Sequence, residues 1–73
     1  MALSTRNRLR GRVTSVVKGE AAAKVSLDVG DSTMVALITR ESAEELGLSE
    51  GQEVVALVKA TDVMIMTEDG GLA

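Results

Sequence analysis

The stretch AKVSLDVGDSTMVALI, residues 23–38, is the part of the sequence that decides the fold. Its first half alternates apolar and polar side chains, as expected of a strand with one buried face. The turn-forming residues Gly30, Asp31 and Ser32 then separate this run from a second apolar run. The stretch therefore predicts an antiparallel hairpin in which a strand at Ala23–Val29 pairs with a strand at Thr33–Ile38.

Further strands are predicted on both sides of this hairpin. Before it, Leu9–Val17 alternates loosely and leads into the hairpin through a turn at Lys18–Glu20. After it, Glu53–Lys59 and Val63–Met66 are short apolar runs bounded by polar residues. Both of these runs are apolar on each face, which predicts that a partner subunit covers the face that does not fill the core. The alternative is that the helix and the tail of the same chain cover it.

One short helix is predicted between the third and fourth strands. Thr39 is a suitable N-cap, because its hydroxyl can accept from the N–H of Glu41 or Ser42. Gly47 ends the helix, since it can adopt a positive φ and let Leu48 fold back in a Schellman motif. Five strands and this helix predict an all-β domain with one short helix, arranged as a five-stranded OB-like Greek-key barrel.

The composition is that of one small domain with little material for a core. The chain has 73 residues, 45% of them hydrophobic, but it has no aromatic residue and no cysteine. Such a core is marginal on its own, which favours self-association. We expect one domain over residues 1–67 and a disordered tail over residues 68–73. No signal peptide or membrane-spanning run is visible, and the lack of cysteine fits a reducing compartment, so we expect a soluble cytoplasmic protein.

Charge and chemistry argue against several classes of function. The net charge of −3 and the absence of aromatic side chains disfavour a general nucleic-acid binder. Half of all the cations lie in the basic run Arg6, Arg8, Arg10 and Arg12. The last three of these arginines are interpreted as a solvated strand edge, with a nucleic-acid arm as the alternative. The chain has no histidine, no cysteine and no Gly-rich phosphate loop, which predicts a protein that is not an enzyme.

Three short segments are rich in hydrogen-bond donors and suit a small tetrahedral oxyanion. Ser4–Asn7 offers a hydroxyl, a guanidinium and an amide, and Thr39–Ala43 offers two hydroxyls and the N–H groups of a helix start. Lys59 adds a cation, and the next residue adds an unhindered backbone N–H. The candidate oxyanion-binding residues are Ser4, Arg6, Asn7, Thr39, Ser42, Ala43, Lys59 and Ala60. No side chain is expected to coordinate a metal directly.

These segments, together with the residues around them, resemble the molbindin family, the small molybdenum-pterin-binding or Mop proteins. The resemblance runs from about Leu3 to about Thr67 and identifies the chain as the stand-alone, single-domain form. It implies an OB-like barrel that assembles as a hexamer, a trimer of dimers, with molybdate or tungstate held between subunits. The family's serine and arginine match Ser4 and Arg6, its helix-start pair matches Thr39 and Ser42 followed by Ala43, and its strand-end lysine matches Lys59 followed by Ala60.

The resemblance also implies how the site is divided. The N-terminal segment of one subunit meets the helix and the lysine of a neighbour, and the N–H groups of Ser42, Ala43 and Ala60 complete the cage. The family can hold a second class of anion near its three-fold axes. The hairpin turn near that place carries Glu20 in this chain, where several relatives have Asn, and this puts the second site in doubt.

The expected function is therefore non-enzymatic binding and storage of molybdate or tungstate, with no organic cofactor and no nucleic acid. Two alternatives remain. One is a structural or regulatory oligomeric module that binds a protein or DNA partner. The other is an enzyme or carrier for a pterin, which would need an aromatic or deep apolar slot that the sequence does not offer.

Overall fold

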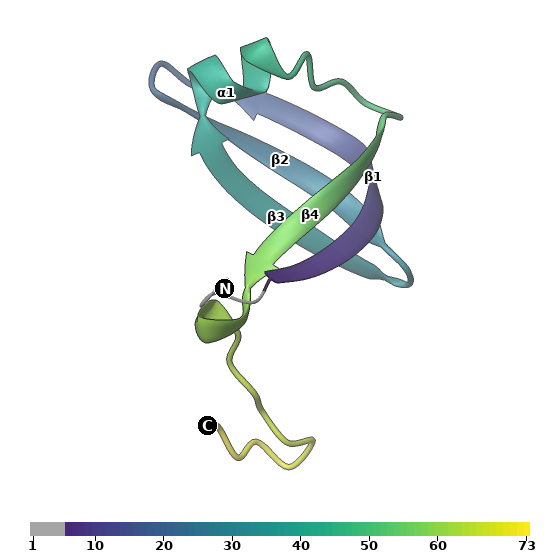
Figure 1. The fold of residues 1–73 in the computed structure, drawn as a ribbon, viewed down its shortest axis with the longest axis vertical. Helices are drawn as coiled ribbons and strands as arrows, with labels where there is room; N and C mark the ends of the chain where they lie inside the picture. The colour runs from purple at the N-terminus through teal and green to yellow at the C-terminus, as the bar shows by residue number, and fades with distance from the viewer. Residues whose placement is uncertain (1–5) are drawn as a thin grey trace, which may run out of the picture.

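The structure is a computed structural model that describes residues 6–73. Its elements follow one another in the order strand, strand, strand, helix, strand and 3-10 helix (Figure 1). They are β1 (Arg6–Lys18), β2 (Ala22–Val29), β3 (Ser32–Thr39), α1 (Arg40–Glu45), β4 (Glu53–Lys59) and η1 (Ala60–Asp62).

The four strands form one antiparallel sheet in the order β3-β2-β1-β4. The predicted hairpin is confirmed, because β2 and β3 pair continuously from Ala22↔Thr39 to Val29↔Ser32. β1 is longer than predicted and begins at Arg6, since its first half pairs with β4 from Arg6↔Lys59 to Arg12↔Glu53. Its second half pairs with β2, so β1 connects the two halves of the sheet.

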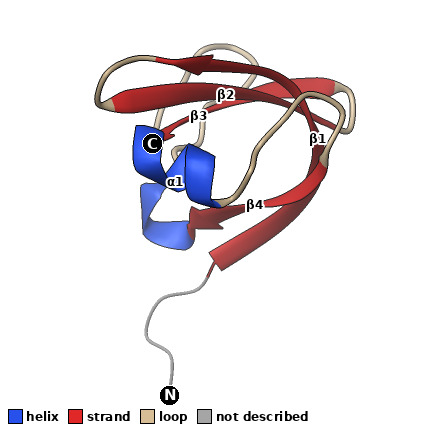
Figure 2. Cartoon of the chain, turned by 90° about the horizontal axis from the view of Figure 1, so that it is seen from above, coloured by secondary structure: helices blue, strands red, loops and turns tan. Residues whose placement is uncertain are grey.

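β1 bends where its partner changes from β4 to β2. The register with β2 shifts between Val13 and Ser15, which is a β-bulge, and bulges increase local twist and bending. Gly11 allows the close approach at this bend, because a Cβ atom there would lie 2.8 Å from the carbonyl oxygen of Asp28. The result is a strongly curved sheet, seen from above in Figure 2.

A small apolar core lies on the concave side of the sheet. Val13, Val25 and Leu27 are buried, at 1%, 3% and 4% exposure. Partly buried apolar residues surround them: Val16, Val29, Met34, Ala36, Ile38, Leu48, Val54 and Ala56. Because β1 and β2 supply the three buried residues of this cluster, the centre of the sheet is better covered than its β3 and β4 edges.

Both ends of α1 agree with the sequence prediction. Thr39 is the N-cap and its side chain accepts from the N–H of Ser42. At the other end Gly47 has a φ of 61°. Its N–H donates to Glu44 O at 3.1 Å, and Leu48 N–H donates to Ala43 O at 3.1 Å. These two bonds form the predicted Schellman motif.

The prediction of a fifth strand at Val63–Met66 is wrong for the single chain, and the sheet is not closed. After β4, η1 turns the chain away from the sheet, so this segment projects from the body (Figure 1). Within the described residues it belongs to no strand and makes a single bridge, Met66↔Leu72. The backbones of Ile65 and Ala73 exchange hydrogen bonds of 3.1 and 2.7 Å, which forms a local turn. The disorder expected for residues 68–73 stays a prediction.

Candidate functional site

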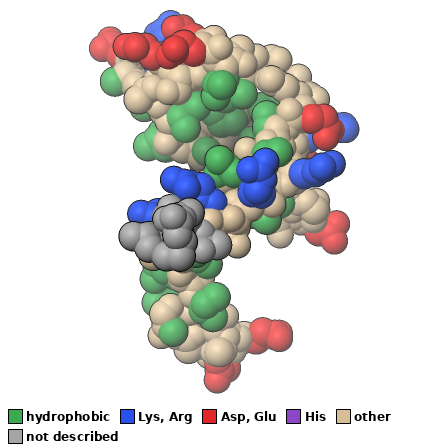
Figure 3. Space-filling model, viewed as in Figure 1, with side chains coloured by type: hydrophobic (Ala, Val, Ile, Leu, Met, Phe, Trp, Pro, Cys, Tyr) green, Lys and Arg blue, Asp and Glu red, His purple; other side chains and the backbone are tan. Residues whose placement is uncertain are grey.

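Two cations face each other where β1 begins and β4 ends. Arg6 and Lys59 are direct cross-strand partners, and both are exposed. Like charges opposite one another destabilise a sheet, unless an anion lies between or beside them. Figure 3 shows the Lys and Arg side chains gathered on this part of the molecule, whereas acidic side chains gather at the α1 end and on the C-terminal tail. This end of the sheet therefore favours an anionic ligand.

Backbone and amide groups fix the position of these cations. The Asn7 side-chain amide donates to the carbonyl of Val58 at 3.3 Å, next to the Arg6–Lys59 pair. This bond adds to the backbone pairing of β1 with β4 and so supports their register. Ala60 starts η1 and is exposed, and its N–H has no acceptor within residues 6–73. Arg6, Lys59 and the Ala60 N–H thus form one group of donors.

A second group of donors lies at the start of α1. Thr39 Oγ1 accepts from the Ser42 N–H at 3.0 Å and donates to Ser42 Oγ at 2.8 Å. The Thr39 hydroxyl is consequently used inside the cap, whereas the Ser42 hydroxyl accepts from it and keeps its own proton to donate. The expectation that the Ser42 N–H binds a ligand does not fit this conformation. Ala43 is fully buried at 0% exposure, so its N–H is also covered.

Within one chain, the two groups of donors lie at opposite ends of the sheet. β1 has 13 residues, which corresponds to roughly 40 Å along the strand at about 3.3 Å per residue. Arg6 is at its start, whereas Thr39 pairs with Ala22, just beyond its far end (Figure 1). The structure also places Lys59 beside Arg6 of the same chain, which differs from the division implied by the resemblance. Ser4 lies outside the described residues.

The surroundings of α1 are acidic. A shallow depression of about 440 Å³ beside the helix start is lined by Glu20, Ala21, Thr39, Arg40, Glu41 and Glu44. Its one cation, Arg40, is engaged, because it donates to Glu44 Oε2 at 3.2 Å and to Gly19 O at 3.3 Å. A dianion beside Thr39 and Ser42 would therefore need cations from elsewhere.

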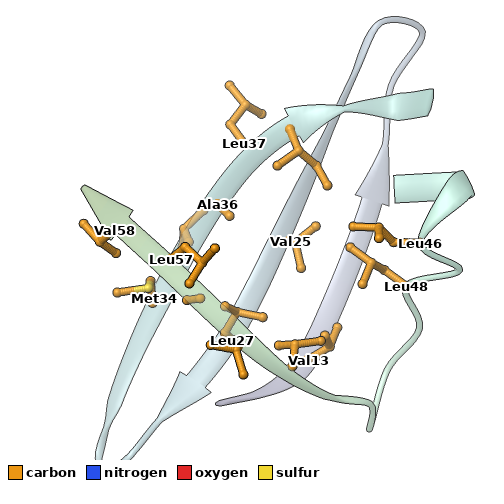
Figure 4. Close-up of a pocket in the computed structure, with 15 residues that line it drawn as sticks. Val13, Val25, Leu27, Met34, Ala36, Leu37, Leu46, Leu48, Leu57 and Val58 are labelled. Atoms are coloured by element: carbon orange, nitrogen blue, oxygen red, sulfur yellow. The ribbon is translucent and has the colours of Figure 1, made fainter. Parts of the chain in front are cut away.

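An open apolar groove lies between the two edges of the sheet. It measures about 460 Å³ and is lined mainly by side chains of β3, β4 and the loop after α1 (Figure 4). Labelled side chains from both edges, such as Met34 and Leu57, lie along it. No local sequence pattern predicts a groove at this place, because its walls come from strands far apart in the chain. Its chemistry suits an apolar segment rather than an oxyanion.

Within residues 6–73 there is no group of acidic, histidine or cysteine side chains that could hold a metal ion. In the same residues no helix has the length and apolar character required to cross a membrane.

Known proteins resemble this chain closely. The TOBE domain family model matches residues 3–65. Molybdenum-pterin-binding protein 2 of Clostridium pasteurianum is 45% identical over 67 residues, which cover 90% of this chain and 98% of that protein. A molybdate-binding protein from Sporomusa ovata has a solved structure with a TM-score of 0.83 and 40% identity, over 92% of this chain and 100% of that one. The solved apo structure of MopII from Clostridium pasteurianum has a TM-score of 0.81 and 43% identity, over 90% of this chain and 100% of that one.

Proposed function

Since this chain belongs to the TOBE domain family, we propose that it binds and stores molybdate, or the similar tungstate, without catalysing a reaction. The observation that carries the proposal is the direct pairing of Arg6 with Lys59 at an exposed end of the sheet. Relatives of similar length that are named for binding molybdate or molybdenum-pterin support it. A cytoplasmic location is part of the same proposal.

The ligand in this proposal is the bare oxyanion rather than a pterin. A pterin ring is flat and is usually held by stacking on an aromatic side chain, and this chain has none. A tetrahedral dianion instead needs cations and short donors, which Arg6, Lys59 and Ala60 provide in one place.

The complete site is proposed to form between two copies of the chain. One copy supplies Arg6, Lys59 and the Ala60 N–H, with Ser4 as a further donor. The other supplies the Ser42 hydroxyl, oriented by Thr39, from a helix start that has no unengaged cation of its own. The cations of one copy would thereby offset the carboxylates around the helix of the other.

Self-association is also proposed to close the barrel. The groove between β3 and β4 is apolar, and both strands are sheet edges with unpaired backbone groups. In the same chain Val63, Met64, Ile65 and Met66 project from the body at 45–69% exposure. We propose that this segment of a second copy enters the groove as the fifth strand. Dimers of this kind would then assemble into the hexamer.

Isothermal titration of the purified protein with molybdate tests this function. Sulfate and phosphate serve as control anions, tungstate serves as the competitor, and light scattering fixes the oligomer mass. Tight, selective binding of molybdate and tungstate by an oligomer is the expected result. An equal response to sulfate, or no binding of molybdate, would contradict the proposal.

A further inference from the structure

A stripe of arginines runs along the outer face of β1, away from the core. Successive side chains of a strand alternate between its faces, so Arg6, Arg8, Arg10 and Arg12 share one face. All four are exposed, whereas the intervening Leu9 and Gly11 are partly buried. The stripe therefore leads from the middle of the molecule to the Arg6–Lys59 pair.

The middle of this stripe carries positive charge without acidic partners. Arg12 is paired with Glu53, at 2.9 Å between Nη2 and Oε2. Arg8 and Arg10 instead lie opposite the apolar residues Leu57 and Val55 of β4. Within the described part of the chain neither arginine makes an ion pair. Their guanidinium charges are thus available to act on an approaching anion.

We infer that Arg8 and Arg10 form an electrostatic approach to the oxyanion site, and that they speed capture of the dianion without holding it. This inference rests on the proposed function. The protein as a whole carries a net charge of −3 and repels a dianion. A local run of cations beside the site reverses the sign of the potential on the path inward and raises the association rate.

The amount by which each arginine raises the association rate depends on its distance from the Arg6–Lys59 pair. At about 3.3 Å per residue, Arg8, Arg10 and Arg12 lie roughly 7, 13 and 20 Å from Arg6 along the strand. Coulomb's law in water, screened over about 30 Å at 0.01 M salt, gives about a fivefold slower association without Arg8 and about a twofold slower one without Arg10. At 1 M salt the screening length is about 3 Å, and both effects should disappear.

The test is a stopped-flow measurement of molybdate binding by Arg8→Gln, Arg10→Gln and the double variant, at 0.01 and 1 M salt. A chromogenic catechol reports free molybdate. Arg12→Gln is the distant control, since it changes the net charge by the same amount on the same face, at the end of the stripe where Arg12 is already paired with Glu53. Light scattering and thermal melting confirm that every variant keeps its assembly and fold.

The expected result is a graded loss of association rate, greatest for Arg8, smaller for Arg10 and smallest for Arg12. Dissociation rates should stay unchanged, and 1 M salt should abolish the differences. Equal association rates in all variants, faster dissociation, or a change of oligomer mass would each overturn the inference. If the wild-type protein bound no molybdate at all, the proposed function itself would fail instead.

Discussion

Arg6 and Lys59 are cross-strand partners at the open end of the sheet, where two positive side chains stand opposite one another. A hydrogen bond from the Asn7 side-chain amide to the carbonyl oxygen of Val58 supports this register. This register brings two positive charges together at a place where a dianion can be bound.

The first prediction concerns this pair. Lys59→Gln should weaken molybdate binding about 10- to 100-fold, since a hydrogen bond to a charged group contributes about 1.5–3 kcal/mol. The same change should leave the empty protein equally stable or stabilise it by about 0.2–1 kcal/mol, because it removes a like-charge contact. Titration and urea unfolding measure the two effects. Unchanged binding, or an effect no larger than that of Arg8→Gln at physiological salt, would remove Lys59 from the site.

The second prediction separates the two hydroxyls at the helix start. Ser42→Ala keeps the cap, because the cap uses Thr39 Oγ1 and the Ser42 N–H. It should lower affinity about 10- to 100-fold, the value of one hydrogen bond to a charged ligand, with almost unchanged stability. Thr39→Val instead removes the cap and should cost about 0.5–2 kcal/mol of stability. Equal thermal melting of the two variants would contradict this assignment of roles.

The third prediction tests the bend of β1. Gly11→Ala places a Cβ atom 2.8 Å from Asp28 O and 3.0 Å from a methyl group of Val29. We expect a loss of about 1–3 kcal/mol in urea unfolding, the usual cost of overpacking. Gly19→Ala is the control, because its Cβ would meet only Ala22 O, at 3.3 Å. Full stability of Gly11→Ala would show that the sheet does not need this close approach.

The fourth prediction concerns closure of the barrel by a second copy. The double change Met64→Asp and Ile65→Asp puts one charge on each face of the projecting segment. Entry of these charges into the apolar groove is unfavourable, so the oligomer mass measured by light scattering should fall. Leu72→Asp, at a residue 64% exposed in the tail, should leave the mass unchanged. An unaltered mass in the double variant would exclude this segment from the interface.

The fifth prediction concerns pH and the tail. Hydrogen bonds from the Thr67 hydroxyl and then the Gly71 N–H lower the pKa of the Asp69 carboxyl. Because the folded pKa is depressed, the turn gains stability above the ordinary pKa of Asp and loses it as pH falls through the lowered value. Thr67→Val should therefore raise the pKa of Asp69 in an NMR titration. An unchanged titration curve would show that the turn does not persist in solution.

Features specified by neighbouring residues were predictable from the sequence. The alternation in Ala23–Val29 gave the hairpin, and the residue types at Thr39 and Gly47 gave the helix cap and the Schellman motif. Each depends on contacts a few residues apart. The general anion chemistry was predictable for the same reason, because hydroxyl, lysine and helix-start groups occur in short segments.

Features that depend on distant partners were not predictable. A run such as Val63–Met66 has strand composition, but a strand forms only where another strand offers backbone groups, and η1 turns this run away from its own sheet. The separation of Arg6 from Thr39 follows from the long register of β1 with β4, which no local pattern encodes. The burial of Ala43 likewise follows from tertiary packing.

The measurement that tests the central claim most directly is a crystal structure of the molybdate complex, with the metal located by anomalous scattering. The claim predicts molybdenum within hydrogen-bonding distance of Arg6 and Lys59 of one copy and of the Ser42 hydroxyl of another. Molybdenum bound by a single copy, or at a place away from the Arg6–Lys59 pair, would contradict it.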